Sequence, residues 1–255
     1  MLNELLQSKF IIIELVKAQL KLRYRRTTLG YLWTLLNPLF SMTVISVVFS
    51  TLFNMPFHVF ALYLLTGMVP WLLFNNVATQ ASNSLIFNEG ILRKVYIPIQ
   101  VFPVSAALAC LIDSIYSFFA LLIIILYFGG KLSLALVFLP FSFFLLFMFC
   151  LGVGLIISII TVKFRDLLQI IPIILQGGFF LTPIIYRPDS LHGKLKFIIG
   201  LNPLVPYLNL FRDPLLLGKI PNFETIAQAA ILAIISLVIG IKFYKNQKNK
   251  VIFEL

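Results

Sequence analysis

Charged side chains are scarce in this sequence. Asp, Glu, Lys and Arg make up 11% of its 255 residues, whereas a soluble domain carries about 25%. Hydrophobic residues account for 60% of the chain, and the mean hydropathy is +1.02. A chain of this size cannot bury that much apolar surface in its own core, so the remainder must face lipid. The composition therefore predicts an all-α polytopic membrane protein and excludes a soluble globular domain.

Acidic residues are scarcer than basic ones, nine against 20, which leaves a formal charge of +11. Such an excess would suit nucleic acid only if the basic residues shared one solvated face. Instead they sit at the ends of apolar runs, which is the pattern of membrane-topology signals. We therefore expect no nucleic-acid partner.

Residues that bind metals or perform catalysis are also few. The chain has two histidines, His58 and His192, with no further ligands at metal-binding spacing, and two cysteines, Cys110 and Cys150, inside apolar segments. The phosphate-binding pattern G-x-x-x-x-G-K-[ST] does not occur. We expect no catalytic residue, no metal site and no cofactor bound by this chain, which is predicted not to be an enzyme.

Six apolar segments come close to the length of about 20 residues that a helix needs to cross a bilayer. These segments cover 29–53, 59–80, 101–127, 134–160, 167–185 and 223–243. If both termini lie in the cytoplasm, 14 Lys and Arg residues fall on that side and six on the other. That asymmetry predicts a multi-pass protein with both termini inside. The whole chain, 1–255, is expected to form one transmembrane domain.

Residues 1–26 precede the first span and are predicted to form an amphipathic helix in the cytoplasmic interface. Alternatively, the apolar face of this helix packs against a partner protein. That face is predicted to hold Leu2, Leu5, Leu6, Ile12, Ile13, Val16 and Leu20.

Residues 186–222 are apolar but interrupted by prolines. We expect two short helices, 191–200 and 204–217, that dip back into the outer leaflet. Non-helical backbone at such depth must be buried in protein or line a water-filled cavity. The segment is therefore predicted to be an outer gate, and 223–255 to form the sixth span and a basic cytoplasmic tail.

Asp113 is the one carboxylate deep in a predicted span. An acid in that position is a functional candidate, as in an ion-coupled transporter, although such proteins usually need pairs or relays. The alternative is a hydrogen bond to a neighbouring hydroxyl such as that of Ser114 or Ser117.

Aromatic residues are abundant, with 26 Phe, nine Tyr and two Trp. Aromatic faces stack on the apolar faces of sugar rings, so an aromatic lining would suit a glycan sliding through a pore. The alternative is that most of these rings face lipid or fill the bundle.

Five sequence motifs resemble those of the polysaccharide-export permeases in the type-two ABC exporter family. The first is RYRRTTLGYLWTLLNPL at 23–39, where a basic segment enters the first span through a Trp and an Asn-Pro pair. The others are MVPWLLFNN at 68–76, ILRKVYIPIQVFPV at 91–104, KFRDLLQIIP…LTPIIY between 163 and 186, and LNPL at 201–204.

The resemblance implies a homodimer that pairs with two copies of a cytoplasmic ATPase subunit, which uses ATP and Mg. The complex would export lipid-linked polysaccharide, in the first place lipopolysaccharide O-antigen, across the bacterial inner membrane. Capsular polysaccharide or teichoic acid is the alternative cargo, and an ion-coupled transporter using Asp113 is the alternative mechanism. A membrane enzyme of glycolipid synthesis would need more clustered carboxylates or basic residues in its loops.

Within the exporter mechanism that the resemblance implies, we expect four sets of residues to have roles. Contact with the lipid pyrophosphate or with the membrane interface is expected from Arg23, Tyr24, Arg25 and Arg26. A channel lining is expected from Tyr31, Trp33, Phe40, Phe74, Phe179 and Phe180. The outer gate is expected to involve Pro183, Tyr186, Asn202 and Pro203. Coupling to the ATPase is expected from Glu89, Arg93, Lys94, Arg165 and Asp166.

Overall fold

The computed structural model describes residues 2–23, 28–95, 97–188 and 193–254, and within these ranges every regular element is helical. The prediction of an all-α membrane fold is confirmed. The helices are α1 Leu2–Gln7, α2 Lys9–Arg23, α3 Trp33–Leu52, α4 Phe57–Phe87, α5 Glu89–Leu92, α6 Val101–Tyr127, α7 Leu139–Lys163, α8 Leu167–Leu181, α9 Lys194–Gly200, α10 Val205–Arg212 and α11 Phe223–Glu254.

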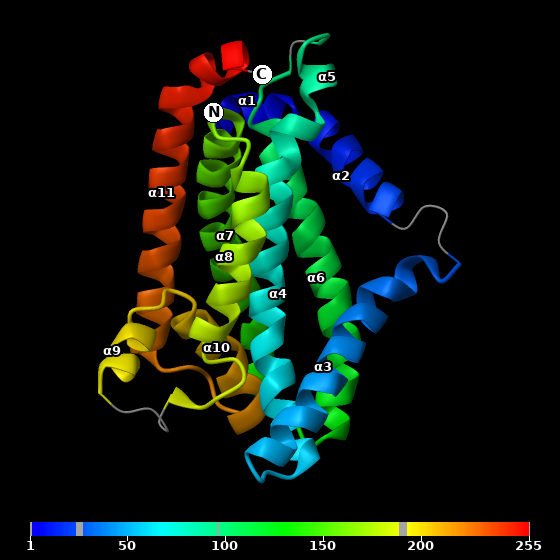
Figure 1. The fold of residues 1–255 in the computed structure, drawn as a ribbon, viewed down its shortest axis with the longest axis vertical. Helices are drawn as coiled ribbons and strands as arrows, with labels where there is room; N and C mark the ends of the chain where they lie inside the picture. The colour runs from blue at the N-terminus through cyan, green and yellow to red at the C-terminus, as the bar shows by residue number, and fades with distance from the viewer. Residues whose placement is uncertain (1, 24–27, 96, 189–192, 255) are drawn as a thin grey trace.

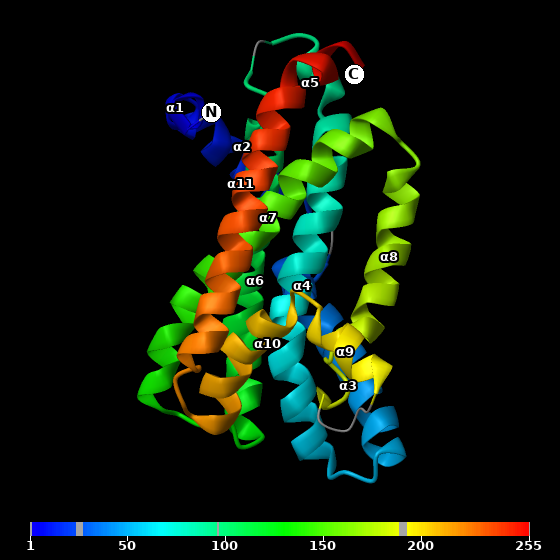
Figure 2. The same ribbon diagram turned by 90° about the vertical axis from the view of Figure 1, so that its left-hand side faces the viewer.

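Five of these elements are long and apolar enough to cross a membrane. They are Trp33–Leu52, Phe57–Phe87, Val101–Tyr127, Leu134–Lys163 and Phe223–Gln247. The predicted fifth span, 167–185, is a shorter helix, because α8 has 15 residues and ends at Leu181, before the Thr182-Pro183 pair. At about 1.5 Å per residue it is about 22 Å long, less than the roughly 30 Å of a hydrocarbon core. A sixth full-length span is therefore not confirmed, although α8 runs alongside α4 from the α7–α8 turn toward α9 (Figure 2).

The long helices lie side by side, with α4, α6 and α7 in the middle (Figures 1 and 2). α1, α5 and the last turns of α11 lie at one end, and the α3–α4 turn, α9 and α10 lie at the other. Of the 18 residues compared in each spanning helix, 61% are buried in α4, against 17% in α3 and 17% in α11. α4 is thus the central helix, whereas α3 and α11 leave most of their surface for lipid or for another chain.

α7 and α11 pack at backbone distance through glycines. A Cβ added to Gly240 would lie 2.5 Å from the carbonyl oxygen of Gly152, and one added to Gly152 would overlap the backbone of Ser236. The Ser236 hydroxyl also donates to the carbonyl oxygen of Phe149 at 2.9 Å. Small residues allow such close approach between helices in a membrane.

The N-terminal segment forms two helices, separated at Ser8, that pack on the start of α6. The Gln100 amide donates to Glu4 at 2.6 Å, and Val16 is buried. Leu6 and Ile13, two residues of the predicted apolar face, are 62% and 47% exposed, so they do not pack on the bundle. The membrane-interface role of this segment stays a prediction.

The region after α8 contains the two predicted short helices. α9 covers 194–200 of the predicted 191–200, and 189–192 lie outside the described residues. α10 covers the start of 204–217, and a wide helical turn follows at Asp213–Leu217. α10 packs against α4, α7 and α11, and the buried Tyr207 hydroxyl donates to the carbonyl oxygen of Ala229 at 2.9 Å.

Candidate functional site

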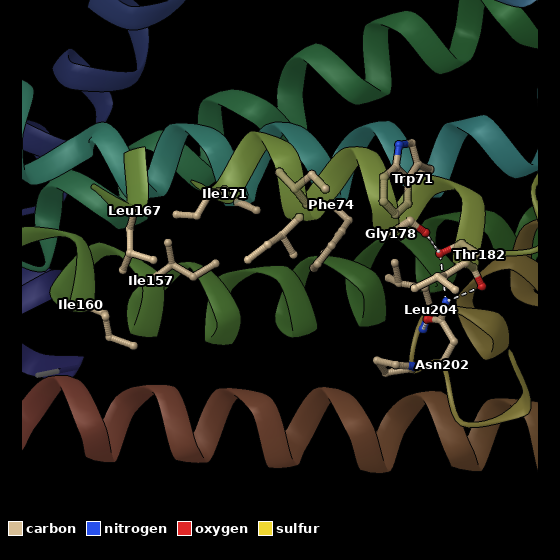
Figure 3. A pocket seen from close by; sticks show the side chains of 15 residues that line it. Trp71, Phe74, Ile157, Ile160, Leu167, Ile171, Gly178, Thr182, Asn202 and Leu204 are labelled. Atoms are coloured by element: carbon tan, nitrogen blue, oxygen red, sulfur yellow. Dashed lines mark hydrogen bonds between the residues drawn. The ribbon is translucent and has the colours of Figure 1, made fainter. Parts of the chain in front are cut away.

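An apolar cavity of about 430 Å³ lies between α4, α7 and α8 and extends to the start of α10 (Figure 3). Ile157 and Ile171 line its middle, and Trp71 and Gly178 line the part near α10. An added Cβ on Gly178 would lie 3.3 Å from the Trp71 ring, so the glycine gives that ring its space. The cavity suits apolar chains or rings and offers little to a charged ligand.

The cavity brings two of the predicted channel aromatics together. Phe74 lines it directly, and Phe179 packs edge-on against Trp71 with ring centroids 5.7 Å apart. Trp71 also contacts Phe74, at a centroid distance of 6.0 Å. Trp71, which sequence reasoning did not place in the site, is the residue that joins the two.

The other predicted channel aromatics lie apart from this cavity. Phe40 and Phe180 point outward from α3 and α8, 61% and 58% exposed. Trp33 is 41% exposed and lines a second, polar cavity between α3, α4 and α6. The side chain of Tyr31 is outside the described residues. The described aromatics of this set thus lie in separate places within one chain, and their role in a channel between two copies stays a prediction.

The end of α8 is tied to the start of α10 by side-chain hydrogen bonds. The Asn202 amide donates to the Thr182 hydroxyl at 2.9 Å, and that hydroxyl donates to the carbonyl oxygen of Gly178 at 2.7 Å. The backbone N–H of Leu204 donates to the Asn202 side chain at 2.9 Å. These bonds form the polar end of the apolar cavity (Figure 3). The predicted gate residue Pro203 is exposed and also lines the cavity.

Tyr63 of α4 holds the segment that follows α8. Its hydroxyl donates to the carbonyl oxygen of Tyr186 at 2.9 Å, and the carbonyl oxygen of Pro183 lies 3.5 Å away. The Tyr186 hydroxyl in turn donates to the carbonyl oxygen of Phe180 at 3.0 Å. The predicted gate residues Pro183, Tyr186 and Asn202 therefore belong to one hydrogen-bonded region at this end of the bundle.

Arg212 is the charged residue of this region that sequence reasoning missed. It is 6% exposed, its guanidinium lies 3.9 Å from the centroid of the Tyr63 ring, and it donates to the carbonyl oxygen of Ile184 at 3.2 Å. Gly67 makes room, because an added Cβ would lie 2.7 Å from the guanidinium. α10 lies outside the five spanning helices, and burial lowers the pKa of Arg212 to about 10, so the group stays charged at neutral pH. An Arg-Asp-Pro sequence inside an apolar run was the available signal.

At the opposite end, three of the predicted coupling residues meet. Glu89 pairs with Arg93 at 2.6 Å within one helical turn and with Arg165 at 3.6 Å across two connections. Lys94 and Asp166, their neighbours in sequence, are exposed. The pairs join the segment after α4 to the α7–α8 turn.

The predicted pyrophosphate contacts fall largely outside the described residues. Arg23 ends α2 but its side chain is not described, and neither are Tyr24, Arg25 and Arg26. Among the residues that the structure does describe, no three His, Cys, Asp or Glu side chains gather as a metal site.

Comparison with known proteins gives a consistent set of relatives. The model of a family described as ABC-2 type transporter matches residues 12–216. An O-antigen export system permease protein RfbA from Myxococcus xanthus is 26% identical, over 98% of this chain and 97% of the relative. A protein of the same name from Klebsiella pneumoniae is 28% identical, over 94% and 93%. The polysialic acid transport protein KpsM from Escherichia coli is 24% identical, over 94% and 95%.

Proposed function

Since this chain belongs to the ABC-2 type transporter family, we propose that it is the membrane-spanning permease of an ATP-driven polysaccharide exporter, with O-antigen as its cargo. The observation that supports this most directly is the match to O-antigen export permeases along nearly the full length of both chains. The match to KpsM makes capsular polysaccharide the second candidate.

We propose that two copies of the chain form the conduit and that each binds one cytoplasmic ATPase subunit, which supplies ATP and Mg. In this proposal the complex lies in the bacterial inner membrane with both chain termini in the cytoplasm. The end of the bundle that holds α1, α5 and the last turns of α11 then faces the ATPase. Glu89 and its ion-pair partners Arg93 and Arg165 lie at that end, where movement of the ATPase would displace them.

The hydrogen-bonded region at the other end is proposed to be the outer gate. Tyr63, Asn202 and Arg212 attach α10 and the α8–α9 segment to α4 and α8, and these contacts support the proposal. The residues at 23–26 are proposed to contact the pyrophosphate of the lipid-linked substrate, because Arg forks bind phosphate with two parallel hydrogen bonds.

The proposal is tested by co-expressing this chain with its ATPase partner in a strain that lacks its own O-antigen permease, and by measuring O-antigen at the cell surface. Export is expected with the intact partner and should be lost when the phosphate-loop Lys of the ATPase is replaced by Ala, while the complex still assembles. Export that continues without a working ATPase would favour the ion-coupled alternative, and it should then require Asp113.

A further inference from the structure

The apolar cavity between α4, α7 and α8 is long and narrow (Figure 3). Its lining includes both ends of α8, Leu167 and Leu181, which are about 20 Å apart at 1.5 Å per residue. Spread over that length, the volume of about 430 Å³ leaves a mean cross-section of about 20 Å². A helix with its side chains is about 10 Å wide and needs roughly 80 Å². The cavity is therefore too narrow for a helix of another chain.

A single hydrocarbon chain fits this width. Carbon atoms in contact lie about 4 Å apart, so an extended chain fills a column about 4 to 5 Å across, or about 20 Å². Regular methyl branches, as in an isoprenoid chain, would widen that column. The shape of the cavity therefore matches an unbranched chain, such as an acyl chain of a phospholipid.

The lining favours an apolar occupant over water or a polar ligand. Among the described residues that line the cavity none is charged, and the side chains of Thr182 and Asn202 lie together at its end near α10. The Asn202 amide donates to the Thr182 hydroxyl and to the carbonyl oxygen of Leu181, and its oxygen accepts from the backbone N–H of Leu204. A buried water needs about two to four polar partners, and these groups already bond to one another or to the backbone.

The cavity reaches the surface of the chain along α8. Ile174 and Leu181 line it and are 61% and 54% exposed, and a spacing of seven residues puts them on one face of the helix. α4 and α7 both have spanning length, so this opening lies at the depth of the hydrocarbon core. An apolar opening at that depth is continuous with the surrounding lipid, whose acyl chains can enter from the side.

We propose that this cavity binds one acyl chain of a membrane phospholipid, which fills the space between α8 and the helices α4 and α7. The site goes beyond the proposed export function, because its ligand is a lipid of the surrounding membrane and not the cargo. The position of α8 then depends on lipid. Gly178 packs directly on the Trp71 ring, whereas the acyl chain separates α8 from α7 beside Ile157 and Ile171.

The two tryptophans of the chain allow a direct test, because bromine atoms on a lipid chain quench the emission of an indole that they contact. Trp33→Phe leaves Trp71, which lines the cavity, as the only indole of the full-length chain. This chain is reconstituted in nanodiscs of phosphatidylcholine that is brominated at the middle of one acyl chain. We expect Trp71 emission to fall severalfold relative to nanodiscs of the same lipid without bromine. Unchanged emission, the result expected if a second copy of the chain covered the cavity, would overturn the proposal.

Variants that fill the cavity separate a chain inside it from lipid around the protein. Ala78→Leu on α4 and Ile157→Phe on α7 each add side-chain volume to the lining and should remove most of the quenching. Ala120→Leu, on α6 outside the cavity, is the matched control and should leave the quenching unchanged. Equal quenching in all three variants would come from lipid outside the cavity and would contradict the assignment.

An isoprenoid phosphate added to the brominated nanodiscs tests the other source of a long apolar chain. Trp71 emission should stay quenched, whereas recovered emission would show that a branched carrier lipid displaces the acyl chain, and the proposed occupant would be wrong. These measurements use neither cargo nor ATPase, so a negative result leaves the proposed exporter standing. Failure of the chain to export glycan with its ATPase would, in turn, leave the lipid site standing.

Discussion

Tyr63 joins segments that are more than 120 residues apart in the chain. Its hydroxyl binds the carbonyl oxygen of Tyr186, and its ring supports the guanidinium of Arg212 at 3.9 Å. A buried cation needs such support, because leaving it without partners in a low-dielectric interior costs several kcal/mol. One aromatic side chain on α4 thus holds both the α8–α9 segment and α10.

Tyr63→Phe separates the two contacts, because it keeps the ring beside Arg212 and removes the hydroxyl. We expect the free energy of unfolding to fall by about 1 kcal/mol, the usual contribution of one hydrogen bond. Cysteines placed in the 186–188 segment should also become more reactive toward a water-soluble thiol reagent. Both quantities are measured on the purified chain, with Tyr127→Phe, an 85% exposed site, as the control. Equal thiol reactivity in both variants would show that this hydroxyl does not hold the segment.

At the scale of single residues, the sequence predicted which residues belong to the gate region better than it predicted the contacts that they make. Pro183, Tyr186 and Asn202 were expected at the outer gate and do lie together, but Tyr63 and Arg212 were not expected there. Their contacts depend on how α10 folds back against α4. No local pattern specifies that contact, since the residues are far apart in the chain.

α3 contains a proline, and the carbonyl that this proline leaves without a helical hydrogen bond accepts one from another helix. Pro38 has no N–H to donate to the carbonyl of Thr34, four residues earlier. The hydroxyl of Ser117 on α6 donates to that carbonyl oxygen at 3.3 Å. In a membrane such a freed carbonyl must find a donor, and here it also attaches α3, a helix with little other burial, to α6.

A double-mutant cycle tests this attachment. Ser117→Ala should lower the free energy of unfolding by about 1 kcal/mol in the unmodified chain. In a Pro38→Ala background it should cost little, because residue 38 then supplies the missing N–H. Thermal unfolding in mild detergent gives both values. The same cost in both backgrounds would mean that the Ser117 hydroxyl stabilises the protein in some other way.

Element positions were largely predictable from hydropathy, and their ends were not. The third span, 101–127, coincides with α6, but 59–80 is too short because α4 continues to Phe87. Its polar last turns stay helical since their side chains bond back to the helix, as Ser82 and Asn83 do to the carbonyl oxygen of Thr79. In the opposite direction, α8 is shorter than its apolar window because Pro183 follows the last turn.

On the scale of the whole molecule, α4 connects the two ends. Tyr63 and Gly67 lie near its start, beside the gate region, and Glu89 lies two residues after its end at Phe87. α4, with 31 residues, is the most buried of the spanning helices. Because it is packed along its length, a displacement at one end should move the side chains at the other. In the proposed exporter this helix would transmit the motion of the ATPase to the outer gate.

Glu89→Gln tests that path. The ion pairs of Glu89 are exposed on the Arg side, so their loss should change stability by less than about 1 kcal/mol. Export, in contrast, should fall severalfold, because the link between the α4–α5 end and the α7–α8 turn is lost. Surface glycan and ATP hydrolysis are measured on the same complex. Glu224→Gln, an exposed acid at the opposite end of the bundle, serves as the control, and equal export by the two variants would contradict the role of Glu89.

The glycine contact between α7 and α11 has a mechanical consequence. Two backbones that touch without intervening side chains cannot slide past one another, because any shift drives Ser236 or Gly240 into Gly152. We therefore expect α7 and α11 to move together as one rigid body, while other helices move relative to them. If the protein opens, we expect α3 and α8, the two helices at the edges of the bundle, to be the ones that move.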